Sequence, residues 1–240
     1  MSAGASRGVE DLQQIADGSA CFGGVPEPQF GVDVVVVAPT GLDLGDIPAL
    51  FEIVEGQQGY FTAKQAAEVG FLLGSQAHHV KAGNWLRVER GIYRLARFPR
   101  SMEEQYVIYA LWSRNRAGDP VGVYSHETAL SIHDLSDANP SKLHMTVPPN
   151  FRRTASTPEV LVLHRAPLAE GDIERRQGFA VTRPIRTVAD IAALGHQEFA
   201  EQALRDGARR GVITHRQILD LRKRGGHPEW FDRILEQYGA

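Results

Sequence analysis

Basic residues gather between residues 74 and 100 of this 240-residue chain, where Glu89 is the one acid. They are Lys81, Arg87, Arg90, Arg94, Arg97 and Arg100. Such cations bind the phosphates of nucleic acids and release condensed counterions. The charge of this stretch therefore matters more for binding than the net charge of −3 of the whole chain. We expect a phosphate-binding surface here.

The sequence contains no recognisable pattern of catalytic residues. A restriction-type nuclease needs an acid two positions before a lysine, to hold a metal beside an activated water. None of the lysines has an acid at that position: Thr62 precedes Lys64, His79 precedes Lys81, Pro140 precedes Lys142 and Leu221 precedes Lys223. A nucleotidyltransferase needs two acids one residue apart after a Gly-Ser turn, and Asp172 with Glu174 follows no such turn. We therefore expect no enzyme; the alternative is a nuclease whose acids converge only in the folded chain.

Histidine and cysteine usage predicts neither a metal site nor a bound cofactor. Cys21 is the only cysteine, which excludes an internal disulfide or a cysteine-based zinc site and fits a reducing cytoplasm. No two histidines between residues 120 and 220 stand at the helical spacing of metal ligands. They are His126, His133, His144, His164, His196 and His215. We expect structural roles for them, and a local ion pair between Arg186 and Asp190 worth roughly 0.3 to 0.5 kcal/mol.

Two helices are predicted before the basic stretch. Leu50, Phe51 and Val54 share one face of the first helix, because their spacing matches its period. Thr62 begins the second helix. Its hydroxyl can accept from an exposed amide while Gln65 reaches back to the Thr62 amide, the arrangement of a capping box.

A third helix and a β-hairpin carry the basic residues. Gly70 suits the tight turn between the second and third helices. The third helix is predicted within residues 72–82, and two strands over 85–88 and 92–95 follow, with a glycine at the bend. This order of elements is typical of a winged helix-turn-helix that binds duplex DNA, although similar units also serve as protein-binding modules.

The alternation along the hairpin predicts which side chains face outward. Leu86 and Val88 should face the helices and Arg87 the other side. Arg90 should lie at the tip and Arg94 on the return strand, so the outer surface should be cationic. The hairpin is thus the predicted wing.

The predicted DNA contacts divide into those that read bases and those that hold phosphates. Base-edge candidates are Ser75, Gln76 and His78, with His79 expected to face the core beside Val80. Phosphate or minor-groove candidates are Lys81, Arg87, Arg90 and Arg94. Thr62 and Lys64, at the start of the second helix, complete the predicted contacts.

Composition and the proline at position 99 divide the chain into three parts. Residues 1–45 are acidic and rich in glycine and proline, and we expect a largely disordered arm with a valine-rich segment that could add a strand. Residues 46–98 form the predicted winged helix-turn-helix domain. Residues 101–240 form a second domain, since 42% apolar residues in a chain of this length exceed what the first domain buries. No apolar run is long enough for a membrane span, and no secretory signal is recognisable.

The second domain is predicted to place a small, mostly antiparallel sheet against helices, which makes the whole chain α+β. Ser101 with Glu104 should cap its first helix. Strands are predicted over 142–147, 159–164 and 173–182. Further helices are predicted over 125–133, 186–194, 197–210, from the capping pair Thr214 and Gln217 onward, and over 227–238.

These residues resemble the AbiEi family, antitoxins of type IV abortive-infection toxin-antitoxin systems. In the first domain the resemblance rests on Gly59–Thr62, His79–Trp85, Arg87 and Arg90–Leu95. In the second it rests on Tyr124–Leu130, Leu143–Pro148, Thr182–Pro184 and Arg186–Asp190. It covers about residues 47–223. Leu72, Leu73 and Gly74 depart from it, because relatives have polar or basic residues at the start of the reading helix.

The resemblance implies a cytoplasmic phage-defence protein in two parts. The winged helix would repress its own promoter, where inverted repeats would suit two copies bound side by side. The C-terminal domain would oppose a cognate nucleotidyltransferase-like toxin, AbiEii, although no individual residue carries over for that role. No membrane, small-molecule substrate or cofactor is implied.

Overall fold

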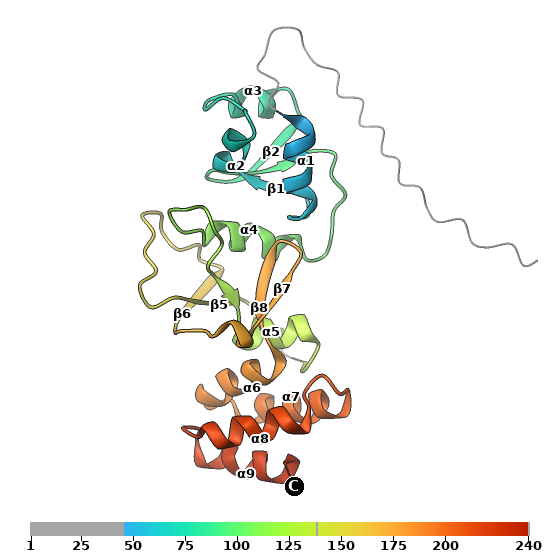
Figure 1. Ribbon diagram of the computed structural model, residues 1–240, viewed down its shortest axis with the longest axis vertical. Helices are drawn as coiled ribbons and strands as arrows, with labels where there is room; N and C mark the ends of the chain where they lie inside the picture. The colour runs from blue at the N-terminus through green and yellow to red at the C-terminus, as the bar shows by residue number, and fades with distance from the viewer. Residues whose placement is uncertain (1–45, 138, 240) are drawn as a thin grey trace, which may run out of the picture. The chain divides into compact units, whose positions relative to one another are not determined.

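The computed structural model describes residues 46–137 and 139–239, whose elements are labelled in Figure 1. Helices and two small β-sheets make up this part of the chain, which confirms the α+β class. All of these residues belong to one compact unit. The arm and the valine-rich strand expected within residues 1–45 lie outside the described residues.

The first six elements are three helices and the three strands of a small sheet, and the helices pack on one face of that sheet. They are α1 (Ile47–Glu55), β1 (Tyr60–Thr62), α2 (Ala63–Glu68), α3 (Gln76–Lys81), β2 (Trp85–Glu89) and β3 (Ile92–Leu95). The strand order is β1-β3-β2, and both pairings are antiparallel. The three helices and the hairpin agree with the sequence pattern. β1 is too short to produce a recognisable alternation, so the sequence pattern does not show it.

Side-chain caps begin two of these helices. Asp46 Oδ1 accepts from the Ala49 amide at 2.9 Å. Thr62 Oγ1 accepts from the Gln65 amide at 3.2 Å, and Gln65 Oε1 accepts from the Thr62 amide at 2.9 Å. The predicted capping box is therefore confirmed. Gly70, with a φ of 90°, provides the turn after α2 that other residues rarely adopt.

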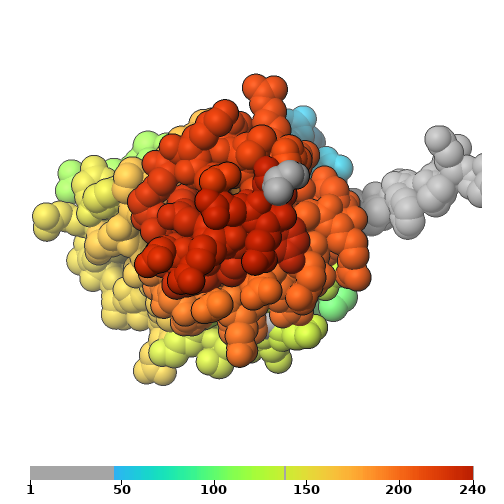
Figure 2. Space-filling view, turned by 90° about the horizontal axis from the view of Figure 1, so that it is seen from below, coloured from blue at the N-terminus to red at the C-terminus, as the bar shows by residue number. Residues whose placement is uncertain are grey.

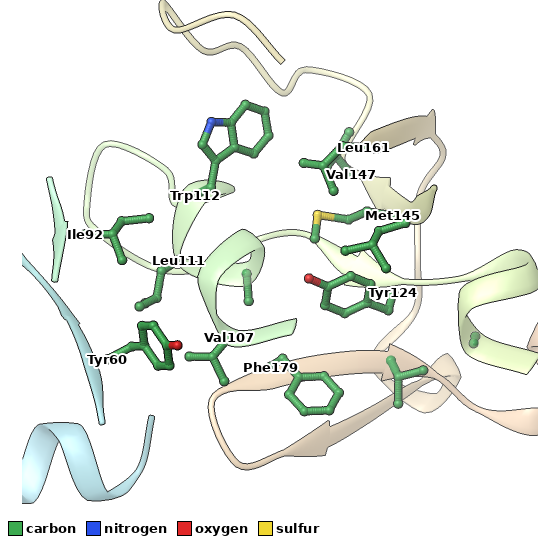
Figure 3. Close-up of a cluster of buried hydrophobic side chains, with 14 of the residues drawn as sticks. Tyr60, Ile92, Val107, Leu111, Trp112, Tyr124, Met145, Val147, Leu161 and Phe179 are labelled. Carbon is green, nitrogen blue, oxygen red and sulfur yellow. The ribbon is translucent and has the colours of Figure 1, made fainter. Parts of the chain in front are cut away.

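The three-stranded sheet is covered on both faces. Phe61 and Trp85 point to α1, α2 and α3, and their rings meet edge to face with centroids 4.8 Å apart. Tyr60 and Ile92 point the other way, into a core that includes α4 (Glu104–Trp112). Figure 3 shows these two side chains facing α4. The face of the sheet that carries Tyr60 and Ile92 is therefore covered by α4 and is not exposed to solvent.

This second covered face corrects the predicted orientation of the hairpin. The prediction that Leu86 and Val88 face the helices is wrong, because Trp85 is the buried residue there and Leu86 is 41% exposed. Side chains alternate along a strand, so Arg87 shares the face of Trp85 while Val88 packs on the core that contains α4. The alternation of β2 is as predicted, but its assignment to the two faces is reversed.

Helix α4 lies between the two sheets. Figure 3 shows Val107 and Leu111 of α4 between Tyr60 on one side and Tyr124 on the other. Its predicted capping box is wrong. The helix begins at Glu104, with Glu103 as its N-cap residue, and no side chain caps it, while the Ser101 hydroxyl donates to the Gln58 side chain.

The second sheet has the strand order β6-β5-β4-β8-β7. Its strands are β4 (Val123–Tyr124), β5 (Leu143–Val147), β6 (Leu161–Arg165), β7 (Ile173–Arg176) and β8 (Phe179–Thr182), with a 3-10 turn, η1 (Glu170–Asp172), before β7. Two pairings are antiparallel and two are parallel, so this sheet is mixed and not mostly antiparallel as expected. The single strand expected over 173–182 is a hairpin, because the chain turns at Gly178 with a φ of 85°.

The remaining helices follow β4 and β8 along the chain. They are α5 (His126–His133), α6 (Pro184–Ala193), α7 (Gln197–Arg209), α8 (His215–Arg224) and α9 (Glu229–Tyr238). Ile191, Leu204 and Phe231 are fully buried in their common core. The Thr214 and Gln217 box is confirmed, with both of its hydrogen bonds present. Helices of this group make up most of the face in Figure 2. No helix within the described ranges combines the length and apolar character needed to span a bilayer.

Candidate nucleic-acid interface

Three exposed cations lie on α3 and the β2–β3 hairpin. Lys81 ends α3, Arg87 lies on β2 and Arg90 lies in the turn before β3. Helix α3 and β2 are in contact, so these groups belong to adjoining elements. None of the three is ion-paired or hydrogen-bonded to a residue that the structure describes. Arg97 and Arg100 are exposed as well, although Arg100 pairs with Glu104 at 3.0 Å. An anion can reach the first three without displacing a protein partner.

The polar side chains of α3 are partly engaged by their own turn. The Ser75 hydroxyl donates to the Leu72 carbonyl at 2.9 Å. Gln76 Oε1 accepts from the Gly74 amide at 2.8 Å. His78 is half-buried and makes no such local hydrogen bond among the described residues. His78 is therefore the base-edge candidate whose polar atoms are least committed.

His79 faces the core, as the sequence predicted. Its ring stacks on Trp85 with centroids 4.3 Å apart and meets Phe71 edge to face at 5.4 Å. Burial lowers the pKa of His79, and the neighbouring His78 adds to that shift. A neutral ring on Trp85 is a packing element that fixes α3 against β2.

Arg94 is not on the outer surface, and the prediction that it contacts DNA is wrong. Its side chain is 3% exposed, and its guanidinium donates to the carbonyls of Leu95, Phe98 and Pro99 at 3.1, 2.6 and 3.0 Å. Its Nε lies 3.6 Å from Glu104 Oε2, which is an ion pair too long for a hydrogen bond. The reason is the covered second face of the sheet: Arg94 shares that face with Ile92, under α4.

The start of α2 also departs from the prediction. Thr62 is 2% exposed and its hydroxyl caps α2, so it is not placed to touch DNA. Lys64 remains half-exposed, but its Nζ donates to the Ala117 carbonyl and lies 3.7 Å from Glu68. Neither residue adds a free cation to the surface of Lys81, Arg87 and Arg90.

A cluster of histidines, which the sequence pattern did not reveal, lies between α5 and the second sheet. The rings of His126 and His164 stack with centroids 3.7 Å apart, and His144 Nδ1 lies 3.1 Å from His164 Nε2. Glu127 joins the cluster, with Oε2 2.8 Å from His144 Nε2 and Oε1 3.2 Å from His196 Nδ1. Neutral rings fit this chain of contacts, because His144 can donate to Glu127 while it accepts from His164.

Burial favours the neutral form of the His126, His144 and His164 imidazoles. It lowers the pKa of His126 to about 3, with smaller contributions from the neighbouring His164 and His144 rings, whose protonation would disfavour a second positive charge. The pKa values of His144 and His164 are lowered as well, again first by burial. His126 Nδ1 lies 2.8 Å from the Ser125 hydroxyl, but Ser125 is fully buried, so the pair offers no accessible nucleophile.

The expectation of structural histidines is compatible with this cluster, although nothing in the sequence indicates that they meet. Their positions are 18 to 70 residues apart, on α5, β5, β6 and the start of α7. Within the described ranges no group of three or more His, Cys, Asp or Glu side chains is arranged to hold a metal ion. The predicted pair of Arg186 and Asp190 is confirmed at 2.8 Å, and Asp172 joins it at 2.9 Å from Arg186.

Known proteins offer few parallels to this chain. No protein-family model matches the sequence, and no curated protein matches it. A crystal structure of the RV2827C protein from Mycobacterium tuberculosis is similar, with a TM-score of 0.47 and 13% identity over 85% of this chain and 80% of that one. A similarity of this size establishes neither a shared fold nor a shared function.

Proposed function

We propose that residues 46–98 are a winged helix-turn-helix that binds duplex DNA, and that the protein represses its own promoter. The observation that carries this proposal is the set of exposed, unpaired cations Lys81, Arg87 and Arg90 on α3 and the hairpin. Unpaired cations gain the full counterion-release free energy when they meet phosphates, because no intramolecular ion pair must first be broken. The topology, with α2, a glycine turn, α3 and a hairpin, supports the same proposal.

The division of roles follows from the geometry. Lys81, Arg87 and Arg90 hold phosphates, which positions the protein without specifying a sequence. His78 can offer a ring nitrogen to a base edge, whereas the hydroxyl proton of Ser75 and Oε1 of Gln76 are engaged in the turn before α3, so a bidentate contact from Gln76 requires release of that turn. We therefore expect strong electrostatic binding with sequence preference contributed by few side chains.

The wing is tested by the double variant Arg87→Gln and Arg90→Gln. Binding to a labelled duplex of the chain's own promoter is measured by fluorescence anisotropy over a range of salt concentrations. The slope of log K against log salt should fall by about two, at roughly 0.9 for each phosphate that the variant no longer neutralises. Because both residues are exposed, the thermal stability should hardly change.

The matched control removes two exposed arginines from the C-terminal helices. Arg216→Gln with Arg233→Gln changes the net charge equally, at side chains that are 92% and 69% exposed on α8 and α9. It should leave the slope unchanged. An unchanged slope in the wing variant, or an equal fall in the control, refutes the wing as the binding surface.

We further propose that the C-terminal part is an antitoxin domain that opposes an AbiEii-like nucleotidyltransferase toxin in the cytoplasm. This part rests on the resemblance alone, through the motifs around His126, Leu143 and Arg186. In this proposal the chain is not an enzyme and needs neither cofactor nor small-molecule substrate. The identity of the gene immediately downstream tests it, and a nucleotidyltransferase gene there would support it.

A protein-binding role for the first domain is the second candidate, because two large apolar side chains stand exposed. Leu72 and Leu73, before α3, are 61% and 82% exposed. Isolated exposed leucines are common, but an adjacent pair suits a partner surface. Failure of every promoter fragment to bind at low salt would favour this role over DNA binding.

A further inference from the structure

Two arginines outside the predicted DNA contacts lie together next to the hairpin turn. Arg114 follows α4 and donates from Nη1 to the Leu111 carbonyl at 2.7 Å. Arg153 donates from Nη1 to the carbonyl of Arg114 at 3.2 Å, and its guanidinium lies over the Trp112 ring, 5.2 Å from the centroid. Each guanidinium has five N–H donors and uses one of them in these contacts.

This pair has positive charge without a compensating acid. Neither arginine is ion-paired with any residue that the structure describes. Arg153 Nε is buried and has no hydrogen-bond partner there. Burial lowers the pKa of both groups, and the charge of Arg153 lowers that of Arg114 further. Two half-buried like charges with unused donors are costly alone, and a bound anion removes that cost.

The pair adjoins the cationic hairpin. A Cβ atom added to Gly91 would lie 3.2 Å from Arg114 Nη2, so the guanidinium reaches the backbone of the β2–β3 turn. Arg90 is exposed in the same turn. The loop after Arg114 also carries the exposed Arg116 and accepts the Lys64 hydrogen bond at Ala117. Positive charge therefore continues from the hairpin onto the end of α4.

We propose that Arg114 and Arg153 together bind one backbone phosphate of the duplex that the hairpin grips. This inference rests on the proposed DNA-binding function and extends its surface beyond residues 46–98. Paired guanidiniums present several N–H groups to phosphate oxygens at once, which suits phosphate better than a single lysine does. The stack on Trp112 holds Arg153 in place before the phosphate arrives.

The test uses the full chain with Arg114→Gln and Arg153→Gln made separately and together. When the salt concentration is raised fourfold, the loss of duplex affinity should be about 3.5-fold smaller for the variant that lacks both arginines than for the wild type, since one phosphate is no longer neutralised, and each single variant should fall between the two. Arg153→Lys keeps the charge and should restore most of the salt dependence. Arg216→Gln, on α8, is the matched control and should behave as the wild type.

A second measurement separates this site from the function as a whole. Inorganic phosphate should raise the melting temperature of the wild type above that in sodium chloride of equal ionic strength, and the two Gln variants should lose this increment. Duplex binding with an unchanged salt dependence in both variants overturns the proposal, as does the absence of any phosphate-specific increment in the wild type. If the increment depends on both arginines but no duplex binds, the proposed function fails and duplex DNA is not the ligand.

Discussion

Mild acid should destabilise this protein through its histidine cluster. His126 is 7% exposed, and its pKa is lowered from 6.5 to about 3 by burial and then by His164 and His144. The unfolded chain takes up a proton on this residue as the pH falls below 6.5, whereas the folded chain does not until about pH 3. Because the unfolded state binds more protons in this window, stability present above pH 6.5 is lost progressively as the pH falls.

The size of the effect follows from the two pKa values. At about pH 5 the unfolded imidazole is protonated roughly thirty times more often than it is neutral, while the folded one stays neutral. His126 alone should therefore lower the free energy of unfolding by about 2 kcal/mol between about pH 7.5 and pH 5. His144 and His164 act in the same direction, because burial lowers their pKa values too. Besides these two rings, the titratable or charged groups near His126 are Arg186, His196 and, through its contact with His144, Glu127.

Urea denaturation followed by circular dichroism measures this loss in the wild type and in His126→Asn. Asparagine suits the site because His126 has a φ of 54°, a conformation that asparagine tolerates better than most residues. The variant loses the stack on His164, so its stability should be lower at neutral pH. The informative quantity is the pH dependence, which should be smaller in the variant by about 2 kcal/mol over the same range.

His215→Asn is the matched control, since His215 is exposed at the start of α8. It should keep the pH dependence of the wild type. If His126→Asn loses as much stability in mild acid as the wild type does, the cluster is not what makes the fold acid-sensitive, and the reasoning from burial is refuted.

Two further changes test how the first sheet and the second sheet are built. Arg94→Met should lower the free energy of unfolding by about 2 to 4 kcal/mol, because it removes a buried donor from three carbonyls and leaves Glu104 with Arg100 as its remaining ion-pair partner. It should leave the salt dependence of duplex binding intact, and a stable variant with a reduced salt slope would return Arg94 to the binding surface. Gly122→Ala should cost roughly 1 to 3 kcal/mol in urea denaturation, because the added Cβ would lie 2.1 Å from Met145 Sδ and 2.9 Å from Ser113 Cβ. Gly171→Ala, where no atom lies within 4 Å of the added Cβ, should be nearly neutral, and equal losses in the two variants would contradict the packing argument.

The helices of this chain were largely predictable because their signals are local. Thr62 with Gln65 and Thr214 with Gln217 each satisfy amides three residues apart, whatever the rest of the chain does. Ser101 and Glu104 have the same spacing but form no cap, and the Ser101 hydroxyl is instead part of a contact with Gln58, a side chain 43 residues away. A capping pattern alone is thus not sufficient to predict a cap.

The short strands and the mixed sheet were not predictable in the same way. β1 and β4 have three and two residues, too few for an alternating pattern to stand out. Whether neighbouring strands run parallel depends on the path between them, as in the pairing of β5 with β6. The turn at Gly178 is visible in the sequence only as one glycine in an otherwise continuous strand pattern.

The candidate DNA surface shows the same limit at the level of single side chains. Alternation along β3 correctly places Arg94 on the face opposite Tyr93, but it cannot say what covers that face. Helix α4 does, from outside the predicted domain, and it turns a predicted phosphate contact into a buried group that holds Leu95, Phe98 and Pro99. The same helix ends next to Arg114, which adds a guanidinium to the hairpin turn. The residues that the proposed surface loses and gains are therefore both determined by α4, so a domain boundary drawn at Pro99 would separate the first sheet from the helix that completes it.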